Sequence, residues 1–85
     1  MKHAGPTALA TLEPLLAQIR QRPGLKESRP GVFYRKSKAF LHFHEDANGL
    51  FADIRGPEDA DFFRLPVSSA QDREALIARI DQSLC

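Results

Sequence analysis

Residues 39–56, with the sequence AFLHFHEDANGLFADIRG, constrain the fold of this chain more than any other segment. Apolar side chains alternate with other side chains on both sides of Asn48-Gly49, and this pair is favoured at the centre of a two-residue β-hairpin turn. Such alternation is typical of a strand that buries one of its faces. The segment therefore predicts two antiparallel strands, residues 39–44 and 50–55, joined by a tight turn.

A turn centred on Asn48-Gly49 also fixes which residues face one another. Opposed residues of an antiparallel pair point to the same side of the sheet, so His44 should face Asp53 and His42 should face Arg55. One side then collects the predicted core residues Leu41, Phe43, Leu50, Ala52 and Ile54. The other side, called the histidine face because it carries His42 and His44, is expected to hold Phe33, Phe40, His42, His44, Phe51, Asp53 and Arg55.

Two more strands are expected beside this hairpin. Residues 32–35 are rich in aromatic and β-branched side chains and precede a short polar turn. The same alternation places Val32 and Tyr34 on the core side and Phe33 on the histidine face. Residues 62–67 predict a further strand, which must lie at an edge because Pro66 cannot donate a ladder hydrogen bond. The segment LKESRPG, residues 25–31, is expected to be a loop.

Amphipathic helices are predicted at both ends of the chain. Near the N-terminus Thr11 is the expected N-cap, with Pro14 in the first turn, and the apolar stripe is Leu12, Leu15, Leu16 and Ile19. Near the C-terminus Ser69 and Asp72 form a capping box, and the stripe is Leu76, Ile77, Ile80 and Leu84. Residues 1–6 are expected to be disordered. The predicted fold is α+β: an N-terminal helix, an antiparallel three- to four-stranded meander sheet, and a C-terminal helix, with both helices on the Leu41, Phe43 and Ile54 side.

Composition limits the classes of function. Eighty-five residues make one domain, 1–85, and 12 basic against 11 acidic residues give a net charge of +1. Binding to nucleic acid needs clustered positive charge, which this balance does not favour. The single cysteine, Cys85, excludes an internal disulfide and is typical of a reducing, cytoplasmic location. No apolar stretch approaches the roughly 20 residues of a membrane span.

The His-x-His pair suggests a metal site. On one strand His42 and His44 lie about 6.6–6.8 Å apart at the backbone and point to the same side. Asp53 could supply a third ligand, and three protein ligands with an open position are typical of catalytic zinc. The alternative is an ion pair between His44 and Asp53 across two strands, which requires no ligand.

Three functions stay open from these residues. A face that mixes aromatic rings with a few polar groups has the composition of binding sites and interfaces, so a non-catalytic binding or protein-interaction module is expected, with a homodimer as one form of it. The first alternative is a small metal-binding protein or a metal-dependent enzyme, with zinc or a similar divalent ion as its cofactor. The second is nucleic-acid binding, with the aromatic rings as a stacking platform. The chain has no glycine-rich phosphate loop and no nucleophile elbow, so catalysis is not favoured.

The segments KAFLHFHED, GLFADIR and FFRLPV, followed by the C-terminal helix, resemble those of small bacterial α+β domains. The similarity is to the luciferase-family domain of unknown function, which has a His-x-His strand, and more loosely to the YjbR-like proteins. It covers roughly residues 32–84, and His42 and His44 are the residues that match the His-x-His pair. The resemblance implies an antiparallel sheet with helices packed against it. The YjbR-like similarity also implies a DNA-binding role.

Overall fold

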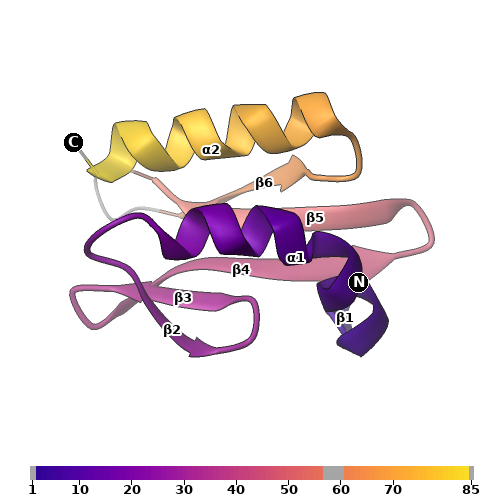
Figure 1. The fold of residues 1–85 in the computed structure, drawn as a ribbon, viewed down its shortest axis with the longest axis horizontal. Helices are drawn as coiled ribbons and strands as arrows, with labels where there is room; N and C mark the ends of the chain where they lie inside the picture. Colours follow the sequence, from indigo (N-terminus) through magenta and orange to yellow (C-terminus); the bar gives the residue numbers. More distant parts are fainter. Residues whose placement is uncertain (1, 57–60, 85) are drawn as a thin grey trace.

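The computed structural model of the protein describes residues 2–56 and 61–84, so that Met1 and Cys85 lie outside the described residues. The helices are α1 (Pro6–Arg20) and α2 (Ala70–Leu84). The strands are β1 (Lys2–His3), β2 (Lys26–Arg29), β3 (Val32–Arg35), β4 (Lys38–Asp46), β5 (Gly49–Arg55) and β6 (Phe62–Pro66). The antiparallel sheet, together with one helix near the N-terminus and one near the C-terminus, confirms the predicted α+β class (Figure 1).

The sheet runs in the order β2-β3-β4-β5-β6, and β1 pairs with β4 outside this path. Along one edge of the long strand β4, β3 covers the first half and β1 the second half, where His3 lies opposite His44. β6 lies at the edge, as Pro66 requires. Residues 2–6 were expected to be disordered. They instead form β1, the buried residue Ala4 and the start of α1, because Ala4 N donates to Phe43 O at 3.0 Å.

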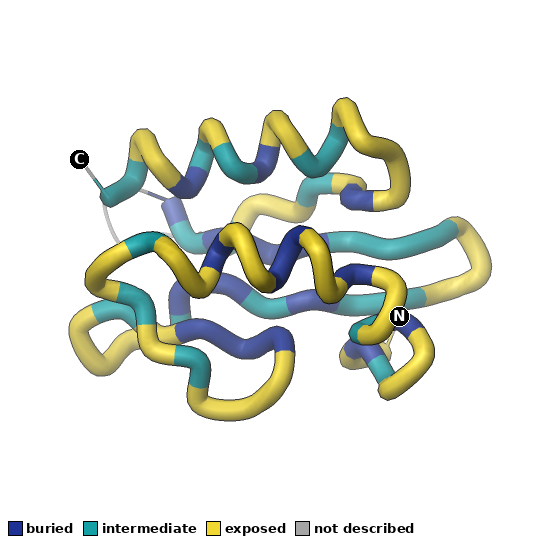
Figure 2. Tube along the Cα trace, viewed as in Figure 1, coloured by how far each residue is buried: buried dark blue, intermediate teal, exposed yellow. Residues whose placement is uncertain are grey.

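Both helices lie on the same side of the sheet, as predicted (Figures 1 and 2). The apolar stripe of α1 and residues Leu76 and Ile80 of α2 join one core cluster with Leu41, Phe43 and Ile54. Full burial of each such aliphatic or aromatic side chain contributes about 1.5–3 kcal/mol. The histidine face is thus the side of the sheet that neither helix covers.

The helix ends follow local capping chemistry. In α2 the predicted box is confirmed, because Asp72 N donates to Ser69 Oγ at 3.0 Å and Ser69 N donates to Asp72 Oδ2 at 3.3 Å. The predicted start of the first helix at Thr11 is wrong. α1 begins at Pro6, in the first helical position, where a missing N–H costs little. Pro14 is therefore inside the helix, where it is exposed.

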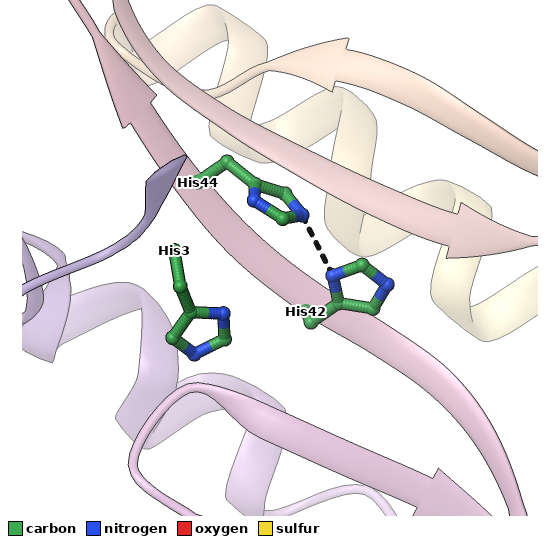
Figure 3. Close-up of side chains that lie close together, drawn as sticks. All are labelled: His3, His42 and His44. Carbon is green, nitrogen blue, oxygen red and sulfur yellow. Dashed lines mark hydrogen bonds between the residues drawn. The ribbon is translucent and has the colours of Figure 1, made fainter. Parts of the chain in front are cut away.

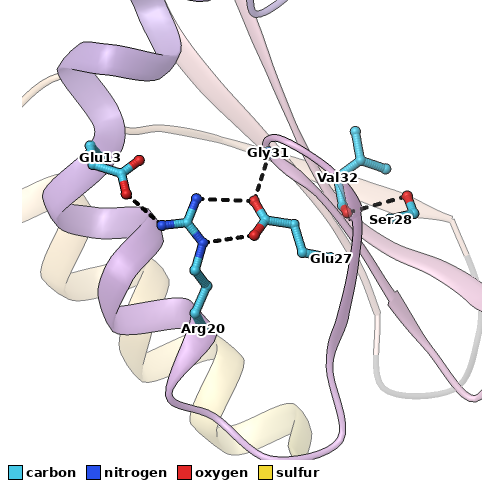
Figure 4. Close-up of polar contacts among 6 residues, drawn as sticks. All are labelled: Glu13, Arg20, Glu27, Ser28, Gly31 and Val32. Carbon is cyan, nitrogen blue, oxygen red and sulfur yellow. Dashed lines mark hydrogen bonds and ion pairs between the residues drawn. The ribbon is translucent and has the colours of Figure 1, made fainter.

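The expected loop at residues 25–31 contains β2, which pairs with β3. Arg20, at the end of α1, explains the position of β2. The guanidinium of Arg20 donates hydrogen bonds to Glu13 on the helix and to Glu27 on β2 (Figure 4). Glu27 in turn accepts the backbone N–H of Gly31 at 3.1 Å. A strand made almost entirely of polar residues is thereby held against the helix by ion pairs. Periodicity of apolar residues could not reveal it.

A β-bulge corrects the predicted positions of Phe33 and Phe40. The turn at Lys36-Ser37 has positive φ at both residues, 52° and 70°, as a type I′ hairpin requires. Regular pairing from this turn would place Phe33 opposite Phe40, with both on the histidine face. The register shifts by one residue instead, so Phe33 lies opposite Leu41. Both phenylalanines are buried in the core cluster, with 1% and 4% of their surface exposed, and neither belongs to the histidine face.

The turn between β4 and β5 is also displaced from its predicted position. Asp46 lies opposite Gly49, so Ala47 and Asn48 form the turn, and Asp46 Oδ1 accepts the Asn48 N–H at 2.7 Å. The predicted pairing is therefore wrong by two residues: His42 faces Asp53, and His44 faces Phe51. Because a shift of two residues preserves the side to which each side chain points, both histidines stay on the expected face.

Candidate metal centre

All three histidines of the chain meet on the histidine face (Figure 3). His42 and His44 extend from β4 to the same side, and β1 brings His3 opposite His44 in the ladder. One ring nitrogen from each of the three side chains lies within 4.8 Å of the others. Among the described residues this is the group of side chains that could hold a metal ion.

The ring of His44 contacts each of the other two rings. His42 Nδ1 lies 2.8 Å from His44 Nε2, within hydrogen-bond distance. The ring centroids of His42 and His44 are 4.8 Å apart, and those of His3 and His44 are 5.8 Å apart, both in edge-to-face arrangements. His44 is thus the central ring of the cluster.

Asp53 supports this central ring. Its carboxylate is buried and accepts two hydrogen bonds from Arg64, each 2.7 Å long. Its Oδ2 atom also lies 3.1 Å from His44 Nε2. The hydrogen bonds from Arg64 lower the pKa of Asp53, so the carboxylate is ionised at neutral pH and can only accept protons. Asp53 was expected to be a metal ligand; it contacts His44 but lies outside the group of three converging nitrogens.

The contact with Asp53 favours one arrangement of the protons on two rings. Because the ionised Asp53 only accepts, a hydrogen on the neighbouring Nε2 of His44, 3.1 Å away, is the favourable form. His42 Nδ1, 2.8 Å from the same atom, then accepts with its lone pair. Neutral His42 therefore carries its proton on Nε2. A metal ion entering the cluster would meet the His42 lone pair and replace the shared hydrogen of His44.

The environment keeps two of the rings uncharged. Burial lowers the pKa of His42, and the neighbouring His44 lowers it further. The pKa of His3 is lowered by the same two causes in the same order, and Arg29 adds to the effect. Neutral imidazole is the form that binds a metal, so these two side chains are in the binding form at pH 7 without losing a proton.

The spacing suits a small divalent ion. Nitrogens bound to tetrahedral zinc at about 2.0–2.1 Å lie about 3.3 Å from one another. The His42–His44 pair, now 2.8 Å apart, would have to open by about 0.5 Å to reach this spacing. His3 is exposed on a two-residue strand, so its ring can rotate towards the other two. The donor set matches zinc, copper or nickel better than magnesium or calcium, which prefer oxygen ligands.

The remaining residues expected on the histidine face take other positions. Phe51 lies on it, half-buried and opposite His44. Arg55 donates from Nε to Ala39 O at 2.6 Å, and its guanidinium stacks over Phe62 at 4.6 Å. Phe62 also contacts His42 edge-on, with ring centroids 4.9 Å apart. A row of π systems therefore extends from Arg55 through Phe62 to the histidines.

His3 is the functional residue that sequence reasoning missed. The two residues of β1 are too few to show the alternation of a strand, and residues 1–6 were predicted to be disordered. The available signal was only that the chain has three histidines and that two of them already formed a pair.

Comparison of the chain with protein-family models, with curated proteins and with solved structures finds no match. The resemblance to the luciferase-family domain and to the YjbR-like proteins therefore stays a prediction, as does self-association through the histidine face. Within residues 2–56 and 61–84, neither helix is long and apolar enough to cross a membrane.

Proposed function

We propose that this chain is a non-catalytic binding module whose ligand is a divalent transition-metal ion, with zinc as the reference ion. His3, His42 and His44 are the ligands, and the carboxylate of Asp53 lies beside His44. The observation that carries the proposal is the convergence of one ring nitrogen from each histidine within 4.8 Å. Three imidazoles leave a fourth coordination position for water or for an outside ligand.

The chemistry around the cluster supports a metal more than a nucleic acid. A stacking platform would need several exposed rings, and Phe33 and Phe40 are in the core. Three imidazoles held together, two of them with a lowered pKa, disfavour protons and leave lone pairs for a softer cation.

Asp53 holds His44 in the metal-free protein and supplies negative charge to the site. Its Oδ2 atom lies 3.1 Å from His44 Nε2, the atom whose hydrogen a metal ion would replace, so with the ion bound Asp53 acts through its charge. Both oxygens of Asp53 are bound by Arg64, so the carboxylate is held in place beside the ring. The negative charge of Asp53 favours a cation, while the positive charge of Arg64 opposes it. We expect ligand bonds from nitrogen to supply most of the affinity.

Calorimetric titration and native mass spectrometry of the untagged protein with zinc test this proposal. We expect one ion per chain, a higher melting temperature with zinc, and no response to magnesium. Each of the variants His3→Ala, His42→Ala and His44→Ala should weaken binding at least about tenfold. The surface variant Glu74→Gln, on the distant helix α2, is the matched control. Absence of zinc binding by the folded wild-type protein would leave the histidines as a structural ion-pair cluster and would refute the proposal.

A further inference from the structure

β1 is a short strand with few contacts. It has two residues, both exposed, and it pairs only with Glu45 and His44 of β4. Two hydrogen bonds follow it, from Ala4 N to Phe43 O at 3.0 Å and from Gly5 N to Glu45 Oε2 at 2.6 Å. Short strands with few contacts open more readily than core strands, because few buried contacts are lost when they do.

His3 is the residue by which β1 joins the metal centre. The other two ligands, His42 and His44, lie on the same strand, so either could bind the ion whether or not β1 is in place. Binding through all three side chains therefore crosslinks two strands that are separated by about 40 residues of chain. Only His3 makes the affinity depend on the position of β1.

We propose that metal occupancy locks β1 and the start of α1 onto β4, and that β1 opens when the ion leaves. This inference rests on the proposed metal-binding function. An ion that binds the closed state more tightly must, by linkage, favour closing by the same factor. Opening frees the edge of β4 from Phe43 to Glu45, where Ala4 N now donates to Phe43 O and β1 pairs with His44 and Glu45. The centre thus controls access to one stretch of strand edge.

Amide hydrogen exchange by NMR tests the lock, with Ala4 and Gly5 as reporters because their N–H groups make the two hydrogen bonds behind β1. The wild-type protein is measured with a chelator and with saturating zinc, and so is His3→Ala. Lys2→Ala is the control, since Lys2 is on the same strand but outside the cluster. We expect zinc to slow exchange at Ala4 and Gly5 by roughly tenfold or more in the wild type and in Lys2→Ala, and to leave His3→Ala unchanged.

Thermodynamic linkage sets the expected size of the change in exchange rate. The slowing in the wild type should match the factor by which His3→Ala weakens zinc binding. The inference is overturned if Ala4 in the chelated wild type already exchanges as slowly as the core residue Ala52, or if zinc does not change its exchange. Calorimetric titration of the same samples separates the two proposals. If zinc binds in either case, the proposed function stands without the lock; a protein that does not bind zinc refutes the function itself.

Discussion

His3 lies directly opposite His44 in the ladder between β1 and β4, and their rings meet edge-on with centroids 5.8 Å apart. This pairing converts a common His-x-His strand into a cluster of three imidazoles. A strand of two residues thereby supplies the third ligand of the proposed metal site. The same pairing makes the N-terminal segment part of the centre.

The first prediction tests the two faces of the sheet with a pair of phenylalanines. Phe33 has 1% of its surface exposed in the core, so Phe33→Ala should lower the free energy of unfolding by about 3–5 kcal/mol. Phe62 is half-buried on the histidine face, so Phe62→Ala should cost about 1 kcal/mol. Urea unfolding measures both values. If Phe33→Ala does not fold, Phe33→Leu should cost less than about 1.5 kcal/mol. Equal losses from the two alanine variants would show that the bulge is misplaced.

The second prediction concerns the dependence of stability on pH in the absence of metal. The folded state lowers the pKa of His42 from its usual value of 6.5, chiefly through burial. Above pH 6.5 the ring is neutral in both states, and the stability from this group is fully present. As pH falls below 6.5 the unfolded chain takes up a proton that the folded chain disfavours, so stability is lost, by at most about 1.4 kcal/mol per pH unit.

Urea unfolding at pH 7.5, 6.5 and 5.5 checks this sign. The variant His42→Gln should show a smaller loss between pH 6.5 and 5.5 than the wild type. Asp53 does not confuse the comparison, because its pKa is lowered from 3.8 and its contribution is lost only at more acid pH. Parallel curves for wild type and variant would contradict the role given to His42.

A third prediction separates the two charged neighbours of the centre. Asp53→Asn removes a negative charge beside the centre, so zinc binding should weaken about tenfold. Arg64→Gln removes a positive charge and frees the carboxylate, so zinc binding should strengthen by about three- to tenfold. Isothermal titration of the two variants measures both changes. Weaker binding by Arg64→Gln would mean that the bidentate pair is needed to hold the site together.

A pairing error of two residues left the predicted face of a side chain correct, whereas an error of one residue reversed it. The turn lies one residue earlier than predicted, at Ala47-Asn48, so the pairing shifted by two residues; this left His42 and His44 on the predicted side because side chains alternate with a period of two. The bulge adds one residue at Phe40, which moved Phe33 from the predicted histidine face to the core side. No local sequence pattern indicates this bulge. The contact between His44 and Asp53 was expected from direct pairing, yet it forms diagonally, with His42 opposite the carboxylate.

Elements with a local signal were predicted and elements without one were not. The capping box at Ser69 is encoded within four residues, and the structure confirms it. β1 and β2 are polar or very short, and tertiary contacts place them: the pairing of His3 with β4 and the ion pair of Arg20 with Glu27. The histidine cluster could therefore be predicted only as far as its two members on β4.

Nuclear magnetic resonance of the protein labelled with nitrogen-15 in its histidine rings tests the central claim most directly. During a zinc titration, the ring nitrogens of His3, His42 and His44 should change together and be complete at one equivalent, with one nitrogen of each ring taking the chemical shift of a metal-bound imidazole. A titration in which only His42 and His44 change, while His3 keeps the shifts of a free ring, would contradict a three-histidine centre.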